Sequence, residues 1–305
     1  MPTVLVAGGS GFIGSHIVDR LLDRGHDVFI YDVREPHPDT KKGYKWENID
    51  ISNFSNLLVN MRCRKFDAVY NLASVSNTME CVKDPIKATT VNCVGTTNLL
   101  EASRQTEVNH FIMASSSLIS GIMDERTEYI KPLQSNHNYV TTKLFQEMLV
   151  RDYFMMYGLP YTILRYGICY GPRMTEGVVA DIFIRQALKG GPITVHGDGN
   201  QWRQYVYVED LADANVLAFN DDHIAKTFNI VGYQQVSIGL MAYVVKGHFS
   251  DVEIKFVEKR SHDLKVNFLS TAKASRALGW EAKTSLAEGV EKTIDYYRKN
   301  VITCE

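Results

Sequence analysis

Val4-Leu5-Val6-Ala7-Gly8-Gly9-Ser10-Gly11-Phe12-Ile13-Gly14 is the stretch that decides the fold. Its first four residues form an apolar run that predicts a buried strand, and its spaced glycines predict a tight turn in which the backbone can approach a pyrophosphate. An amphipathic helix pattern follows and ends at Gly25. Because the first N–H groups of a helix are unpaired and stabilise phosphate, the stretch predicts a dinucleotide-binding site.

The second predicted strand, Asp27-Val28-Phe29-Ile30-Tyr31-Asp32, ends in an acid 18 residues after Gly14. A carboxylate at this place can accept hydrogen bonds from both ribose hydroxyls of an adenosine, and it repels a 2′-phosphate. Asp32 therefore favours NAD over NADP as the cofactor. Arg34 follows closely, and since an arginine can accept a 2′-phosphate, NADP stays as the alternative.

Strand and helix patterns alternate through the first half of the chain. Strands are predicted at 66–72, 110–114 and 161–165, and helices at 86–104 and 138–157. This order is typical of an α/β, Rossmann-type doubly wound parallel sheet, which binds its ligands at the carboxyl ends of the strands.

After Arg165 the regular alternation fades, and glycine and proline turns separate shorter elements. This change predicts a smaller, interleaved C-terminal substrate-binding domain. We expect residues 1–165 to form the NAD-binding Rossmann domain, with 205–232 returning to it, and residues 166–204 and 233–305 to form the substrate-binding domain.

Tyr139 and Lys143 stand one turn apart in the predicted helix 138–157. Residues at i and i+4 share a helix face, with their Cβ atoms roughly 5 to 6 Å apart. A free tyrosine has a pKa of about 10, and lowering it to about 7 means favouring the phenolate by roughly 4 kcal/mol. Nearby positive charge in a site shielded from water can supply that much. The pair thus predicts a tyrosine that acts as a base.

Composition argues against several other classes of protein. The chain has 305 residues and a net charge of -2, with no basic stripe for nucleic acid. No apolar run approaches the ~20 residues of a membrane span, and the N-terminus lacks the pattern of a signal peptide. The five cysteines include no CxxC pair and the nine histidines are dispersed, so we expect reduced thiols and no metal site. These features predict a cytoplasmic enzyme without a nucleic-acid or membrane partner.

Longer motifs carry a family resemblance. Gly8–Gly14 matches a GxxGxxG pattern, and Val195–Asp210 is close to VYGDGxQxRDFxYVxD. Shorter matches lie at Asp50-Ile51, Asn71-Leu72-Ala73 (with Asn for His in an HLA signature), Asn92–Ala102, Ala114–Ser117, Leu164–Tyr166 and Tyr170–Arg173. Over nearly its whole length the chain resembles the extended short-chain dehydrogenase/reductases, and within them the NAD-dependent epimerase/dehydratase group that acts on nucleotide sugars.

The resemblance implies a role for each matching residue. Tyr139 would exchange a proton with a sugar hydroxyl while a hydride moves between that carbon and the nicotinamide. Lys143 would hold the nicotinamide ribose and lower the Tyr139 pKa, and Ser116, with Ser117 as the alternative, would bind the reacting oxygen. The implied cofactor contacts are Gly8, Ser10, Gly11, Phe12, Ile13, Gly14, Asp32, Arg34, Asp50, Ile51, Leu72, Ala73, Ser74, Asn92, Ser115, Tyr139, Lys143 and Tyr166. The implied substrate contacts are Ser116, Ser117, Tyr139, Val195, His196, Arg203, Arg260, Asp263 and Asn267.

Departures from the family pattern narrow the reaction. Sugar dehydratases place an Asp-Glu pair directly after the hydroxyl residue, and the related decarboxylases have a Glu there, whereas this chain has Ser117 and Leu118. A leucine cannot transfer a proton, so dehydration and decarboxylation are disfavoured. Ile168 replaces an asparagine that often contacts the diphosphate, which Arg203 would meet as a fork donor. Asn267 stands where a bulky residue restricts the sugar C2 substituent in some epimerases, so we hypothesise that an N-acetylated or otherwise larger sugar fits.

The simplest chemistry that these residues imply is NAD-dependent 4-epimerisation of a UDP-sugar through a transient 4-keto intermediate. The first alternative is an NAD(P)-dependent nucleotide-sugar reductase or dehydrogenase, and the second is a dinucleotide-sensing protein without turnover. The family commonly forms homodimers through the helices predicted here at 86–104 and 138–157. Leu144, Met148 and Leu149 could serve that surface or the protein's own core.

Overall fold

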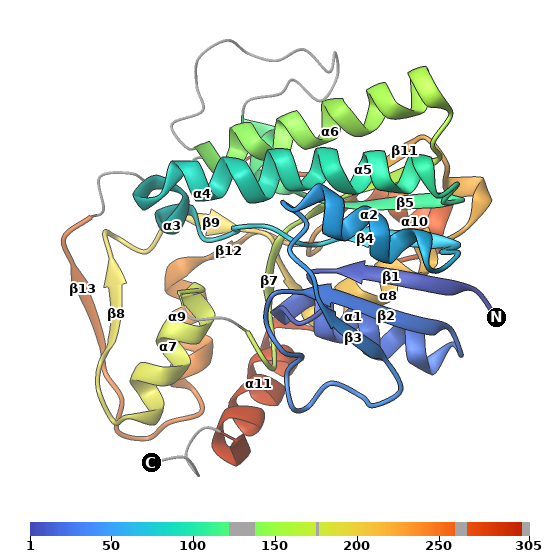
Figure 1. Ribbon diagram of the computed structural model, residues 1–305. Coiled ribbons are helices and arrows are strands. Elements are labelled where there is room, and N and C mark those ends of the chain that lie inside the picture. The colour runs from blue at the N-terminus through green and yellow to red at the C-terminus, as the bar shows by residue number, and fades with distance from the viewer. Residues whose placement is uncertain (122–137, 175–176, 260–266, 301–305) are drawn as a thin grey trace.

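The computed structural model describes residues 1–121, 138–174, 177–259 and 267–300, and a seven-stranded parallel sheet forms its centre (Figure 1). The strand order is β11-β6-β5-β4-β1-β2-β3, so the direction of winding reverses between β1 and β4. The strands are β1 (Thr3–Ala7), β2 (Asp27–Asp32), β3 (Lys45–Asn48), β4 (Ala68–Asn71), β5 (His110–Ser116), β6 (Tyr161–Tyr166) and β11 (Lys226–Ile230). The expected α/β, Rossmann-type sheet is confirmed, and its reversal is the point where such folds bind ligands.

Successive side chains of a strand enter two different cores, one on each face of the sheet. In β1, Val4 and Val6 pack with α1 (Phe12–Asp23), α8 (Val208–Ala218) and α10 (Ala272–Leu278). Leu5 and Ala7 pack on the other face with α2 (Phe54–Arg62), α5 (Gly95–Gln105) and α6 (Asn138–Tyr157). Figure 1 shows α5 and α6 on the opposite side of the sheet from α1 and α8. All four of these β1 side chains are fully buried, and a Val or Leu buried in this way stabilises a fold by about 1.5 to 3 kcal/mol.

A smaller lobe with its own core lies beside the carboxyl edge of the sheet (Figure 1). Its helices α7 (Val179–Leu188), α9 (Ile238–Lys246) and α11 (Leu286–Asn300) pack around three strand pairs. The parallel pairs are β7 (Ile168–Tyr170) with β10 (Tyr205–Tyr207) and β8 (Ile193–His196) with β13 (Ile254–Val257), and the antiparallel pair is β9 (Trp202–Arg203) with β12 (Val236–Ser237). Within the described ranges, no helix has the length and apolar character needed to cross a membrane.

Several elements differ from the sequence-based expectations. The sequence did not predict β3 and α2, because β3 is short and half exposed and lacks a clear alternating pattern. The expected helix 86–104 is a continuous helical run made of α4 (Pro85–Thr89), the π-helical turn η1 (Thr90–Val94) and α5. A short helix, α3 (Thr78–Lys83), precedes it, and the single-turn segments η2 (Ser117–Gly121) and η3 (Asp221–His223) complete the described elements.

The C-terminal part of the chain contributes to both lobes. From the segment 205–232, α8 packs on α1 and β11 joins the main sheet beside β6, while β10 pairs with β7 of the smaller lobe. Ala274, Leu278 and Trp280 also belong to the core of the main sheet, although the expected boundary assigned residues 233–305 to the substrate-binding domain. Trp280 donates a hydrogen bond from Nε1 to the carbonyl oxygen of Asp210 at 2.7 Å, which fixes α10 to α8.

Candidate active site

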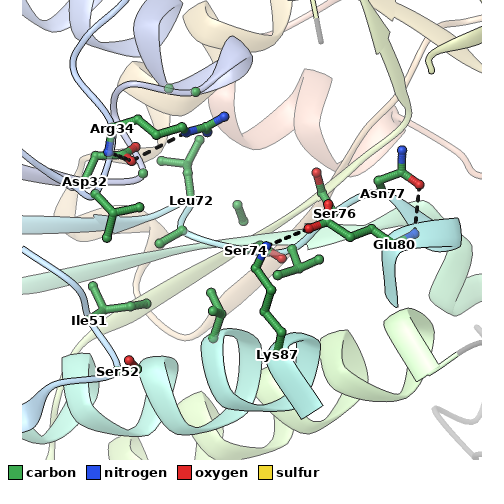
Figure 2. Close-up of a pocket in the computed structure, with 18 of the residues that line it drawn as sticks. Asp32, Arg34, Ile51, Ser52, Leu72, Ser74, Ser76, Asn77, Glu80 and Lys87 are labelled. Atoms are coloured by element: carbon green, nitrogen blue, oxygen red, sulfur yellow. Dashed lines mark hydrogen bonds and ion pairs between the residues drawn. The ribbon is translucent and has the colours of Figure 1, made fainter. Parts of the chain in front are cut away.

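A cavity of about 930 Å³ runs along the carboxyl ends of β1, β2, β4 and β5 and reaches α6. Figure 2 shows Asp32 and Arg34 at one end of it and Asn77, Glu80 and Lys87 well separated from them. Of the expected cofactor residues, all except Ser10 and Asn92 line this cavity. One crevice therefore brings together segments that lie more than a hundred residues apart in the sequence.

The glycine turn forms part of the cavity wall and lets a ligand come close to the backbone. Gly8 has φ +83°, a left-handed conformation that residues with a side chain rarely adopt. A Cβ atom on Gly14 would lie 2.2 Å from the Gly8 carbonyl oxygen, so the turn and α1 can pack this tightly only with glycine there. In the described part of the chain, no side chain caps the N-terminus of α1. Its first N–H groups are therefore available to an anion, and the turn fits the pyrophosphate of a dinucleotide.

Asp32 is held at the end of β2 by backbone donors. Its Oδ2 accepts a hydrogen bond from the Ser10 amide at 3.1 Å, and its Oδ1 accepts one from the Arg34 amide at 3.0 Å. Ser10 thus orients Asp32 through its main chain, and Ser10 also belongs to the lining of a second, smaller cavity near α11. The Arg34 side chain is 66% exposed, and its Nε lies 3.9 Å from the Asp32 carboxylate.

Asn92 lies behind the cavity wall and does not line it. Its side chain is fully buried in η1, where Oδ1 accepts hydrogen bonds from the Val75 amide at 2.8 Å and the Ser74 hydroxyl at 3.1 Å. Its Nδ2 donates to Thr142 Oγ1 at 3.0 Å. Because Ser74 and Val75 line the cavity and Thr142 belongs to α6, Asn92 joins the loop after β4 to the helix that carries Tyr139.

Tyr139 and Lys143 lie at the inner end of the cavity, as neighbours on α6. Their side chains are 8% and 4% exposed, and Lys143 Nζ is 5.9 Å from the centre of the Tyr139 ring. Lys143 donates a hydrogen bond to the Ala114 carbonyl oxygen at 2.9 Å. Ser116, at the end of β5, lies beside Tyr139 and acts to lower its pKa, and its Oγ accepts a hydrogen bond from the Leu118 amide at 3.2 Å. The structure therefore brings the three expected catalytic side chains into one cluster.

The pKa of Tyr139 differs from the expectation. Burial raises the pKa of Tyr139 to about 12, and Ser116 acts in the opposite direction. Burial also lowers the pKa of Lys143 to about 8, against the attraction of Glu147. In the protein chain by itself the pKa of Tyr139 is therefore raised, whereas the resemblance implies that Lys143 lowers it, because removing both groups from water disfavours both charged forms.

The expected substrate contacts are distributed between the two lobes. Ser117 begins η2 directly after Ser116, and Asn267 donates a hydrogen bond to the Ser120 carbonyl oxygen at 2.7 Å. Val195 is fully buried, and His196 Nδ1 lies 3.1 Å from the Glu258 carbonyl oxygen. Arg203 donates from Nη1 to the neighbouring Trp202 carbonyl oxygen at 2.7 Å. Arg260 and Asp263 lie outside the described residues.

The sequence-based reasoning missed two groups of residues near the site. Ser76, Asn77, Glu80, Asp84 and Lys87 line the cavity from the segment that includes α3 and α4, where an ion pair joins Lys87 Nζ to Glu80 at 2.8 Å. Glu147 and Arg165 form a buried pair behind Lys143. Only the second group had a signal in the sequence, since Glu147 follows Lys143 by four residues and so shares its helix face.

These features define an NAD-binding enzyme fold in which a tyrosine, a lysine and a serine lie together at one end of the cofactor crevice. The chain belongs to the NAD-dependent epimerase/dehydratase family, whose family model matches residues 4–231. NAD is the cofactor of this family, so the expected family and the expected cofactor are both confirmed.

The relatives of this chain include enzymes that catalyse different reactions. The chain is 31% identical to a putative UDP-glucose 4-epimerase of Methanocaldococcus jannaschii, over 97% of this chain and 99% of that protein. It is also 31% identical to UDP-glucuronic acid decarboxylase 1 of Xenopus tropicalis, over 98% of this chain and 72% of that protein. The crystal structure of the UDP-glucose 4-epimerase of Thermus thermophilus in complex with NAD superposes with a TM-score of 0.88 at 32% identity, covering 98% of this chain and 99% of that chain.

Proposed function

We propose that this protein is an NAD-dependent nucleotide-sugar 4-epimerase that acts on a UDP-sugar. The observation that carries the proposal is the surroundings of the Tyr139 hydroxyl. Ser116 is the polar side chain beside it, and Leu118, which stands where a decarboxylase or dehydratase has an acid, packs against the same apolar cluster as Tyr139. The side chain of Leu118 cannot act as a second proton donor at that place, which supports reversible oxidation of one hydroxyl as the chemistry.

The roles of the side chains follow from this arrangement. When bound, NAD supplies a hydride acceptor for C4 and a positive charge that favours the phenolate of Tyr139. Tyr139 takes the proton of the C4 hydroxyl as that carbon becomes a ketone, and Ser116 holds the oxygen in place by a hydrogen bond. Lys143 binds the nicotinamide ribose. After the 4-keto sugar has rotated in the site, Tyr139 returns the proton to the C4 oxygen, and the opposite epimer forms.

Product analysis tests the proposed function. Purified protein is incubated with UDP-glucose, UDP-N-acetylglucosamine or UDP-glucuronic acid without added cofactor, and the sugars are followed by NMR together with the absorbance of NADH. We expect interconversion of C4 epimers with no net NADH. Release of carbon dioxide would identify a decarboxylase, and stoichiometric NADH would identify a dehydrogenase; either result contradicts the proposal.

The sugar substituent at C2 is part of the same proposal. Asn267 is committed through its amide to the Ser120 carbonyl oxygen, next to the serines that follow β5. This small, fixed side chain supports the inference that the site accepts an N-acetyl group at C2. In the same product analysis we expect UDP-N-acetylglucosamine to be turned over at least as well as UDP-glucose, and a strong preference for UDP-glucose would contradict this inference.

We also propose that the protein forms a homodimer through α5 and α6. Leu144 and Leu149 pack into the protein's own cores, whereas Met148 and Phe145 on α6 are 49% and 41% exposed. Val94, in the η1 turn that leads into α5, is 46% exposed and adds an apolar side chain at the start of the second helix. Light scattering is expected to give twice the chain mass, and Met148→Glu is expected to give the mass of a single chain. A wild-type protein that is monomeric at micromolar concentration would contradict the assembly.

A further inference from the structure

Glu147 is a fully buried carboxylate that does not line the cofactor cavity. Its Oε1 accepts hydrogen bonds from Arg165 Nε at 2.8 Å and from Ser115 Oγ at 2.6 Å. Its Oε2 accepts one from Arg165 Nη2 at 2.8 Å, and Arg151 Nη2 lies 3.4 Å from the same oxygen. A buried carboxylate is costly unless it is paired and hydrogen-bonded, and a fork-like Arg165 with two donors meets that need.

The contacts of Glu147 belong to a regular set between α6 and the end of β5. Three successive residues of β5 face one residue each of α6: the Ala114 carbonyl accepts a hydrogen bond from Lys143, the Ser115 hydroxyl donates one to Glu147, and the Ser116 side chain lies beside Tyr139. On α6, Tyr139, Lys143 and Glu147 are spaced by four residues and so share one face. The middle contact of the set therefore comes from a residue that does not line the cavity.

The neighbouring strand completes the arrangement. Ser115 of β5 pairs in register with Arg165 of β6, and Ser116 pairs with Tyr166. Glu147 thus holds two adjacent strands and the catalytic helix together at one point. Since an ionised carboxylate can only accept hydrogen bonds, the Ser115 proton points at Glu147 and the oxygen of Ser115 is left as an acceptor for the cavity.

We propose that Glu147 is a positioning residue for the active site, which through Arg165 and Ser115 holds the end of β5 and Lys143 in register with Tyr139. This inference rests on the catalytic roles assigned to Lys143, Tyr139 and Ser116 in the proposed function. Glu147 has a second effect through its charge. It lies one turn from Lys143 and is the strongest group that opposes the loss of the Lys143 proton caused by burial.

The other titratable groups that face Lys143 do not supply this charge. They are Tyr139 on the same helix and the thiols of Cys81 on α3 and Cys93 on η1. Burial raises the pKa of both thiols and of Tyr139, so all three are neutral near pH 7. The negative charge of Glu147 is therefore the one among these groups that favours the ammonium form of Lys143.

The experiment compares Glu147→Gln, the double variant Glu147→Gln with Arg165→Met, and Glu288→Gln. The last is a matched control, because Glu288 forms an exposed ion pair with Lys292 on α11, away from the site. The double variant removes both charges of the buried ion pair. Replacing such a pair by uncharged residues is often neutral or stabilising, so the double variant is expected to fold even where Glu147→Gln alone does not. The readout is the pKa of Lys143, measured by NMR titration with isotope-labelled lysine and assigned with Lys143→Met.

We expect the pKa of Lys143 to fall by about one unit or more in both Glu147 variants and to stay unchanged in Glu288→Gln. We also expect the alkaline limb of the pH profile of kcat to move down with it, and kcat to fall about tenfold with KM little changed. A Lys143 pKa equal to that of the wild type in the folded Glu147 variants would overturn the proposal. The titration of Lys143 does not depend on catalysis. A protein that turns over no nucleotide sugar would count against the proposed function alone, and the titration would still test the role of Glu147.

Discussion

The two ends of the cofactor cavity handle charge in opposite ways. At the adenosine end, Asp32 is fixed by two backbone amides, and Arg34 beside it stays largely exposed. At the other end, Tyr139, Lys143 and Glu147 are almost entirely buried, and burial shifts the pKa of Tyr139 up and that of Lys143 down. The first arrangement also buries its charge, since Asp32 is 8% exposed, but two backbone donors meet the carboxylate. The second withdraws charged groups from water, which costs stability and makes their protonation depend on their neighbours.

Tyr139→Phe is the strongest test of the catalytic end. The change removes the proton path without altering the shape of the cavity wall, so we expect turnover to fall by about 10² to 10⁴-fold with NAD affinity nearly unchanged. Epimerisation rates and the dissociation constant of NAD are measured side by side. If Tyr139→Phe kept wild-type turnover, the assignment of one end of the cavity to binding and the other to catalysis would be wrong.

Lys143→Met separates function from stability. We expect a loss of turnover of about a hundredfold together with a gain in the free energy of unfolding on the order of 3 kcal/mol near pH 7, because the folded state no longer buries an ammonium whose pKa has dropped to about 8.

The gain in the free energy of unfolding from Lys143→Met depends on pH, because the pKa of Lys143 differs between the folded and the unfolded chain. The unfolded chain binds the Lys143 proton up to a pKa of about 10.4, whereas the folded chain loses it above about 8. The stability of the wild type is therefore expected to rise with pH between these two values, and the gain from Lys143→Met should vanish above them. Lys87→Met is the control, since Lys87 also lines the cavity but its side chain is 56% exposed. Equal effects of the two variants on denaturant unfolding would contradict the contrast in burial.

Asp32→Asn probes the adenosine end. We expect the dissociation constant of NAD to rise about tenfold, because a charged hydrogen-bond acceptor for the ribose becomes a neutral one, with kcat at saturating NAD little changed. Calorimetric titration with NAD and with NADP measures both affinities. A loss of kcat at saturating NAD as large as that of Tyr139→Phe would show that the two ends are not independent.

Arg34→Ala is expected to have the smallest effect. The side chain is 66% exposed and lies 3.9 Å from Asp32, and exposed ion pairs contribute about 0 to 1 kcal/mol. The affinity for NAD should therefore stay within about threefold of the wild type. The same calorimetric titration measures this affinity. A loss of NAD affinity larger than that of Asp32→Asn would assign Arg34 a direct contact with the cofactor.

The adenosine end was the easier part to predict from the sequence. The glycines from Gly8 to Gly14 and the acid at Asp32 are close in the chain, and their spacing reflects one strand, one turn and one helix. The pair of Tyr139 and Lys143 was also visible, because four residues make one helical turn. Neither pattern could give the pKa values, since these depend on how much water the rest of the fold excludes.

Other residues of the site depended on contacts that no local pattern reveals. Asn92 seemed to be a cofactor ligand, but the π-helical turn η1 buries its side chain between the loop after β4 and α6. The spacing of Glu147 from Lys143 indicates a shared helix face but not its role, because its partners, Ser115 and Arg165, come from two different strands. The apolar residues of α6 were likewise ambiguous until packing assigned Leu144 and Leu149 to the interior and left Met148 exposed.

The sequence by itself determined the parallel α/β fold and the choice of NAD, and it predicts the tyrosine, lysine and serine of the site, because each of these depends on short-range spacing and residue type. The tertiary structure decided which polar groups meet the cavity, which ones support it from behind, and how strongly each holds its proton. The reason is that burial and long-range hydrogen bonds set the energy of a charge, and both exist only once strands and helices distant in the chain have packed together.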